Sequence, residues 1–129
     1  MITADQAVAE AERLLPGQPS PDSDPDARWQ AIIRVAEFVE SDPEPLWAFV
    51  CRWGSSPDDD LRAAIASCLL EHLLEYHFTE LFPRIARVAR SDPLFADTFL
   101  RCWKFGQSEE PANAARFDAL RAELIARAG

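Results

Sequence analysis

AIIRVAEFVESDPEPLWAFVCRW (residues 31–53) decides the predicted fold, because a related stretch, LFPRIARVARSDPLFADTFLRCW, follows at residues 81–103. The two stretches align without gaps, and self-similarity at a fixed period is typical of proteins built from repeated structural units. We therefore predict two degenerate units of 50 residues. Seven positions are identical in the alignment: Arg34 with Arg84, Ala36 with Ala86, Ser41-Asp42-Pro43 with Ser91-Asp92-Pro93, Phe49 with Phe99, and Trp53 with Trp103.

Each copy places a Ser-Asp-Pro turn between two stretches with apolar residues at helical spacing. Ser41 or Asp42 can cap the exposed amides of the following helix, and Pro43 is tolerated in its first turn. Before the first turn we predict a helix from about Ala27 to Glu40. Its core face holds Trp29, Ile32, Ile33, Ala36 and Val39, and the core face after the turn holds Leu46, Phe49, Val50 and Trp53. No segment alternates apolar and polar residues as a strand would, so the fold class is all-α.

The rest of the chain extends this pattern into a single helical domain, residues 1–129. We predict an N-terminal helix up to residue 15, with Thr3 and Gln6 in capping-box spacing, and then a flexible Pro-rich linker at 16–26. Repeat unit 1 spans 27–77 and ends with a long helix that starts at Ser56-Pro57, where the serine can cap and the proline suits the first turn, and stops at about Tyr76. Repeat unit 2 spans 78–129, with helices from about Thr79–Pro83 to Arg90, from Pro93 to about Phe105, and from Pro111 to Arg127.

Two resemblances follow from these residues. The repeat period is close to that of HEAT and armadillo units, which implies a right-handed α-solenoid-like bundle of about seven helices. Residues 65–103 also resemble a small bacterial helical domain family of unknown function, through Leu69-Leu70-Glu71, Asp92-Pro93-x-Phe95 and Trp103. That second resemblance implies a small bacterial helical protein and no particular activity.

The charge of the chain restricts its partners. A net charge of −9 and a pI near 4.6 argue against nucleic acids and anionic membranes, which bind through clustered basic residues. An acidic surface suits a basic protein partner, although solubility alone would explain it. No stretch is apolar enough to span a membrane, and the acidic N-terminus does not resemble a secretory signal. Cys51, Cys68 and Cys102 lack paired spacing, which indicates reduced thiols and a cytoplasmic location.

The segment CLLEHLLEYH, residues 68–77, contains the residues best suited to chemistry. Cys68, His72 and Glu75 are spaced to share a helix face and could bind zinc, although the pattern matches no known zinc motif. The surrounding leucines instead indicate a central buried helix. Glu71 would then be buried, and we expect an arginine from another helix, Arg34, Arg84 or Arg101, to pair with it.

The remaining candidates each have a structural explanation beside the functional one. Asp58, Asp59 and Asp60 could form an acidic patch, but helix capping accounts for them more simply. Trp47 and Trp103 could line a binding surface, but large aromatic residues more often belong to the core. Ser67 and Cys68 lie inside a helix rather than at a nucleophile elbow, and the four glycines are too scattered for a phosphate loop.

These observations favour a protein-protein interaction module over an enzyme. Its binding residues would come from Asp58, Asp59, Asp60, Glu71, Glu75, Trp47 and Trp103, with no cofactor and a basic protein partner, as in an immunity or inhibitor protein. Two alternatives stay open: a metal-binding protein or enzyme that uses Cys68, Glu71, His72 and Glu75, and a structural subunit that forms a homodimer.

Overall fold

The computed structural model describes residues 2–15 and 27–128, and every regular element within these ranges is helical. The all-α class is therefore confirmed. The predicted linker at 16–26 lies outside the described residues. None of the described helices is long and apolar enough to cross a membrane.

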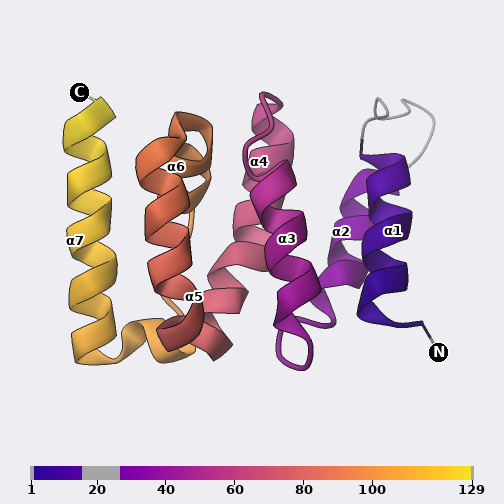
Figure 1. Cartoon of the computed structure of the whole chain (residues 1–129), viewed down its shortest axis with the longest axis horizontal. Helices are drawn as coiled ribbons and strands as arrows, with labels where there is room; N and C mark the ends of the chain where they lie inside the picture. Colours follow the sequence, from indigo (N-terminus) through magenta and orange to yellow (C-terminus); the bar gives the residue numbers. More distant parts are fainter. Residues whose placement is uncertain (1, 16–26, 129) are drawn as a thin grey trace.

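The helices stand side by side in a row that runs from α1 at one end to α7 at the other (Figure 1). They form two layers, because contacts link alternate helices along the chain as well as neighbours. One layer contains α1 (Ala4–Leu14), α3 (Pro43–Trp53), the second half of α5 (Glu71–Ser91) and α7 (Pro111–Ala128). The other contains α2 (Ala27–Ala36), α4 (Asp59–Ile65), the π-helical segment η1 (Ala66–Leu70), the first half of α5, and α6 (Pro93–Leu100).

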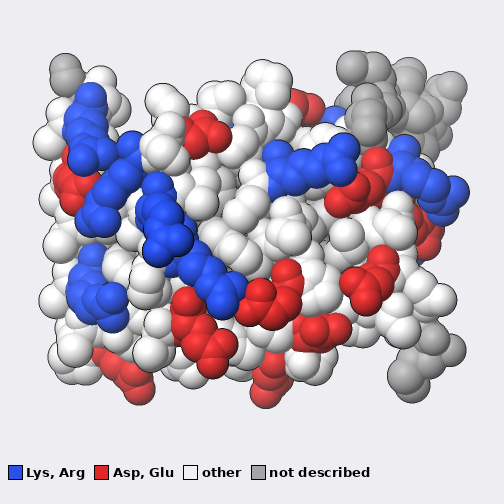
Figure 2. All heavy atoms as spheres, in the orientation of Figure 1, with Lys and Arg blue, Asp and Glu red and all other residues white. Residues whose placement is uncertain are grey.

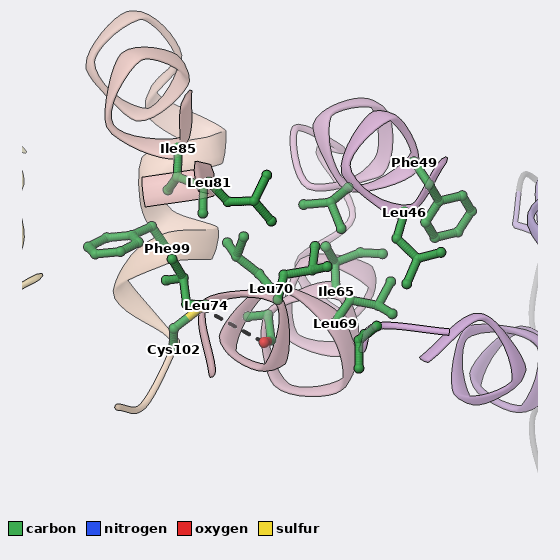
Figure 3. Packing of buried hydrophobic residues seen from close by; sticks show 14 of the residues in the cluster. Leu46, Phe49, Ile65, Leu69, Leu70, Leu74, Leu81, Ile85, Phe99 and Cys102 are labelled. Carbon is green, nitrogen blue, oxygen red and sulfur yellow. Dashed lines mark hydrogen bonds between the residues drawn. The ribbon is translucent and has the colours of Figure 1, made fainter. Parts of the chain in front are cut away.

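The core lies between the two layers, around the continuous helical stretch from α4 to α5. Leu69 and Leu70 of η1 are fully buried there (Figure 3). They pack among Leu46 and Phe49 of α3 and Leu81, Ile85 and Phe99 of α5 and α6. The predicted central buried helix is thus present, and its burial follows from leucines on nearly all of its faces.

Three helix starts have the side-chain caps that their sequences suggest. Thr3 and Gln6 form the predicted capping box of α1. The carboxylates of Asp58 and Asp92 accept hydrogen bonds from backbone amides at the starts of α4 and α6. The predicted cap by Ser56 is wrong, because α4 begins at Asp59 and both Ser56 and Pro57 precede it. Asp42 stands at the equivalent position before α3 but makes no side-chain cap bond. The two Ser-Asp-Pro turns therefore differ in their capping.

Several predicted boundaries and faces are wrong. Helix α2 ends at Ala36 and is followed by a turn at 37–41, and Ile33 is 45% exposed while Val35 occupies the core instead. The helix predicted to reach Phe105 ends at Leu100, after which the chain is extended to the short 3₁₀ helix η2 (Gly106–Glu109). In both cases apolar residues at helical spacing continue beyond the end of the helix. Val39 packs into the core from the turn, whereas Trp103 and Phe105 are exposed.

The identical residues of the two repeats do not all have equivalent environments. Phe49 and Phe99 are both buried, whereas Trp53 is half-buried and Trp103 is 73% exposed.

We expect Phe99→Ala to lower the free energy of unfolding by about 3–5 kcal/mol, because it leaves a cavity in the core. Trp103→Ala should cost less than about 1 kcal/mol. Urea denaturation of both variants checks this, and equal losses would contradict the placement of Trp103.

Candidate functional site

The first half of α5 and the extended segment 102–105 that crosses it form the candidate site. Phe105 stacks on the ring of His72 with a centroid distance of 5.6 Å and an angle of 18° between the planes. The Nδ1 atom of His72 lies 2.8 Å from Glu75 Oε1. The site thus brings residues of the predicted chemical segment against residues that are about thirty positions later in the chain.

The structure does not assemble the alternative zinc site. Within residues 2–15 and 27–128 no group of three histidine, cysteine, aspartate or glutamate side chains could hold a metal ion. His72 and Glu75 contact each other, but Cys68 does not complete a set of ligands with them. Burial raises the pKa of the Cys68 thiol, and this opposes formation of the thiolate that zinc requires. The π-helical geometry of 66–70 also separates Cys68 from the regular α-helical register of His72.

Glu71 is buried, with 3% of its surface exposed, as predicted. The prediction that an arginine pairs with Glu71 is wrong. Arg34 pairs with Glu10, Arg84 with Glu44, and Arg101 with Asp97 and Asp59. The carboxylate accepts a hydrogen bond from the backbone N–H of Trp103, and Oε1 is buried without a partner among the described atoms. Burial therefore raises the pKa of Glu71, and the nearby His72 only partly offsets this effect.

An abrupt bend at His77 divides α5 at the place where the sequence predicted a helix to end. His77 has φ −136° and ψ 40°, outside the helical region, and the helix resumes directly at Phe78. The side chain of Gln107 spans the bend: its Nε2 donates to the carbonyl of Tyr76 at 2.8 Å, and its Oε1 accepts from the backbone N–H of Phe78 at 2.9 Å. One amide side chain thus replaces the backbone bonds that the bend removes.

Two further contacts fix the bend. His77 Nε2 lies 2.8 Å from the carbonyl oxygen of Val39, which ties it to the turn between α2 and α3. Gly106 has φ +51°, and a Cβ atom there would lie 2.6 Å from the side chain of Glu75. Glycine is therefore required for the segment to approach α5 this closely. Sequence reasoning missed Gln107, since nothing near it in the chain indicates that its amide faces a distant helix bend.

Asp58, Asp59 and Asp60 are engaged in contacts within the molecule. Asp58 caps α4 and accepts from Arg28 at 3.0 Å, and although burial opposes ionisation, these bonds lower its pKa. Asp59 pairs with Arg62 and Arg101, and Asp60 accepts from Trp29 Nε1 at 3.3 Å. These carboxylates link α4 to α2 and α6, which agrees with the structural explanation.

The two candidate tryptophans differ. Trp47 is half-buried and meets Phe95 edge-on, with a centroid distance of 6.2 Å. Trp103 is exposed beside a hollow of about 480 Å³, whose lining includes Lys104, Phe117 and Arg121. A core position is therefore wrong for Trp103. The reason is that α6 ends at Leu100, whereas the equivalent helix of the first copy, α3, continues to Trp53.

No protein-family model, curated protein or solved structure matches this sequence. The residues and their arrangement are therefore the basis for any functional conclusion.

Removal of the Gln107 amide tests its role at the bend. We expect Gln107→Ala to lower the free energy of unfolding by about 1–3 kcal/mol, because two backbone groups lose their partner. Amide hydrogen exchange should accelerate selectively at Phe78. Gln30→Ala, on the exposed face of α2, is the matched control and should change neither quantity. Unchanged exchange at Phe78 in the Gln107 variant would contradict the bridging role.

The raised pKa of Glu71 predicts a specific dependence of stability on pH. The folded protein retains the proton to a higher pH than the unfolded chain, whose glutamate has an ordinary pKa of 4.5. Glu71 therefore lowers the free energy of unfolding as the pH rises from 4.5 through its folded pKa.

We expect Glu71→Gln to remove this loss, so that the variant gains stability relative to the wild type between about pH 4.5 and about pH 7.5. Urea denaturation at the two pH values measures the difference. Glu80→Gln is the control, since Glu80 is exposed. A constant difference between Glu71→Gln and the wild type would show that Glu71 does not titrate in this range.

Proposed function

We propose that this chain is a non-catalytic protein-binding module whose acidic edge binds a basic partner protein. The acidic edge consists of Glu37, Glu40, Asp42, Glu80 and Glu109, all exposed and without an ion-pair partner among the described residues. Most other carboxylates of the described chain are held in internal ion pairs or caps. This set of unpaired charges is the observation that carries the proposal.

The acidic edge lies at one end of the helices, where three connections meet. Val39, in the turn between α2 and α3, contacts His77 at the bend of α5. Gln107 of η2 contacts the same bend from the other side. Acidic side chains accordingly gather along the lower half of the face shown in Figure 2. Residues that are distant in the sequence thus present their negative charges together.

The distribution of charge along the chain adds to this field. Residues 1–77 contain 15 acidic and 5 basic side chains, and residues 78–129 contain 7 and 8, so the net charges are −10 and +1. A field of one sign accelerates encounter with an oppositely charged protein and disfavours partners of like charge. Net acidity concentrated in the first 77 residues supports recognition rather than solubility alone.

Aromatic side chains beside the acidic edge could supply the apolar centre of an interface. Tyr76 and Phe105 are each 39% exposed. Tyr76 also lines a hollow of about 200 Å³ together with Glu80 and Gln107. Tyrosine and tryptophan are frequent among the residues that contribute most to binding, and acidic side chains around them would pair with lysines or arginines of the partner.

The finer architecture and the biological setting belong to the same proposal. The alternation of helices between two layers supports a short α-solenoid of two units, a form that commonly presents a binding surface. An immunity or inhibitor protein for a basic toxin or enzyme would have these properties. The three cysteines of the chain are free thiols in the structure, which supports action in a reducing compartment such as the cytoplasm.

A charge-neutralised variant tests the proposal. Glu37→Gln, Glu40→Gln and Asp42→Asn combined should abolish specific capture of a basic protein from a lysate of the source organism, measured by quantitative mass spectrometry. The control carries Ala9→Lys, Ala48→Lys and Ala122→Lys at exposed sites, which changes the net charge equally. We expect the control to retain capture. Equal loss in both variants would indicate nonspecific attraction, and capture of no basic protein by the wild type would reject the proposal.

A further inference from the structure

A groove with basic sides lies between the second half of α5 and α7, in contrast to the acidity of the whole chain. Its volume is about 580 Å³. The exposed apolar residues of its lining are Pro83 and Ala119, which lie over the buried Phe82, Ala86 and Leu120. Three guanidinium groups, those of Arg87, Arg90 and Arg116, stand along it. Figure 2 shows the corresponding stripe of basic side chains over the half of the molecule that contains α5 and α7. The groove thus combines an apolar floor with positive charge.

Two of these arginines are available to a ligand. Arg87 is exposed and forms no ion pair among the described residues. Arg116 also lacks an acidic partner there, and its guanidinium lies over the rings of Phe78 and Phe82, at 5.8 and 5.1 Å from their centroids. Stacking on aromatic rings holds the charge of Arg116 in place while leaving its N–H groups free to bind an anion.

The third arginine is neutralised within the groove. Arg90 forms a bidentate pair with Glu123, with distances of 2.8 and 3.1 Å. This hydrogen bond from Arg90 lowers the pKa of Glu123, so the carboxylate stays ionised near neutral pH. Glu123 also attracts Arg127, at 3.4 Å. The groove therefore keeps a net positive charge from Arg87 and Arg116, and Glu123 restricts where a second anionic group could bind.

We propose that the α5–α7 groove binds an acidic, partly apolar peptide segment of a partner protein. Charge complementarity selects aspartate or glutamate side chains for Arg87 and Arg116, and guanidinium groups bind carboxylates in a planar, two-bond geometry. Pro83 and Ala119, the exposed apolar residues of the lining, would contact an apolar side chain of the same segment. Recognition between two packed helices by apolar anchors and flanking charges is a common mode of peptide binding.

The occupant is a short segment rather than a polyanion. A nucleic acid or an anionic membrane would extend past the few positive groups of the groove, and the net charge of −9 would then repel its phosphates. A peptide with two or three carboxylates can lie within the basic stripe without reaching the acidic edge. This inference is independent of the proposed basic partner, because it concerns a different surface and the opposite charge.

Selection from a phage-displayed library of random dodecapeptides tests the groove even though the natural partner is unidentified. The whole chain serves as bait, alongside Arg87→Glu and the control Arg13→Glu. Arg13 is exposed on α1 and gives the same change of charge outside the groove. We expect the wild type and the control to enrich peptides that combine Asp or Glu with apolar residues. The enriched peptide should bind Arg87→Glu about tenfold more weakly, measured by fluorescence anisotropy.

Backbone amide shifts on peptide addition should map to α5 and α7, and Arg116→Gln should weaken binding while circular dichroism shows a folded protein. Enrichment of basic peptides without any acidic peptides would overturn the groove proposal and support the acidic edge. Absence of enrichment, or equal affinity of the wild type and Arg87→Glu, would also overturn it. Binding to vesicles of phosphatidylserine and phosphatidylcholine with no peptide enriched would identify a membrane surface instead.

Discussion

The bridge between Gln107 and the bend at His77 determines how the two layers are connected. The helical stretch that begins at Asp59 runs through the centre of the molecule, and it can enter the other layer only by bending. A bend leaves a carbonyl and an amide of the backbone without helical partners, and the partly buried amide of Phe78 in particular needs a new acceptor. Gln107 provides both bonds from a residue about thirty positions away.

The acidic edge and the α5–α7 groove both depend on this bend. It places the second half of α5 beside α3 and α7, so that Arg87 faces the groove with Arg116. The same bend brings Tyr76 and Glu80 to the end of the molecule where the turn between α2 and α3 and the η2 segment also lie. The two surfaces are therefore consequences of one change in chain direction, with Glu80 close to the bend and Arg87 further along the second half of α5.

Two buried charged residues of the helical stretch from α4 to α5 are supported unevenly. Arg62 is buried but bonded to Asp97, Asp59 and the carbonyl of Ser56, so its charge is compensated on several sides. Glu71 is equally buried and has one backbone donor, with an oxygen left unpaired. Desolvation then outweighs the attraction of His72, and the neutral form of Glu71 is favoured relative to an exposed glutamate. The predicted pairing of an arginine with Glu71 is wrong, because Arg34 and Arg84 each pair with a more exposed carboxylate, and Arg101 pairs with Asp97 and Asp59.

The sequence by itself determined the helical class, the caps of α1 and α6, the buried leucines and the position of the bend, since apolar spacing, capping residues and proline act over a few neighbouring positions. The two related stretches could also be recognised in the sequence. The exposure of Trp103 could not be predicted from them, because it depends on where α6 ends. Tertiary structure alone decided the partners of Gln107 and Glu71 and the position of Arg87 in the groove, and hence the groove and the acidic edge. Such contacts join residues far apart in the chain, and their geometry arises only when the helices pack.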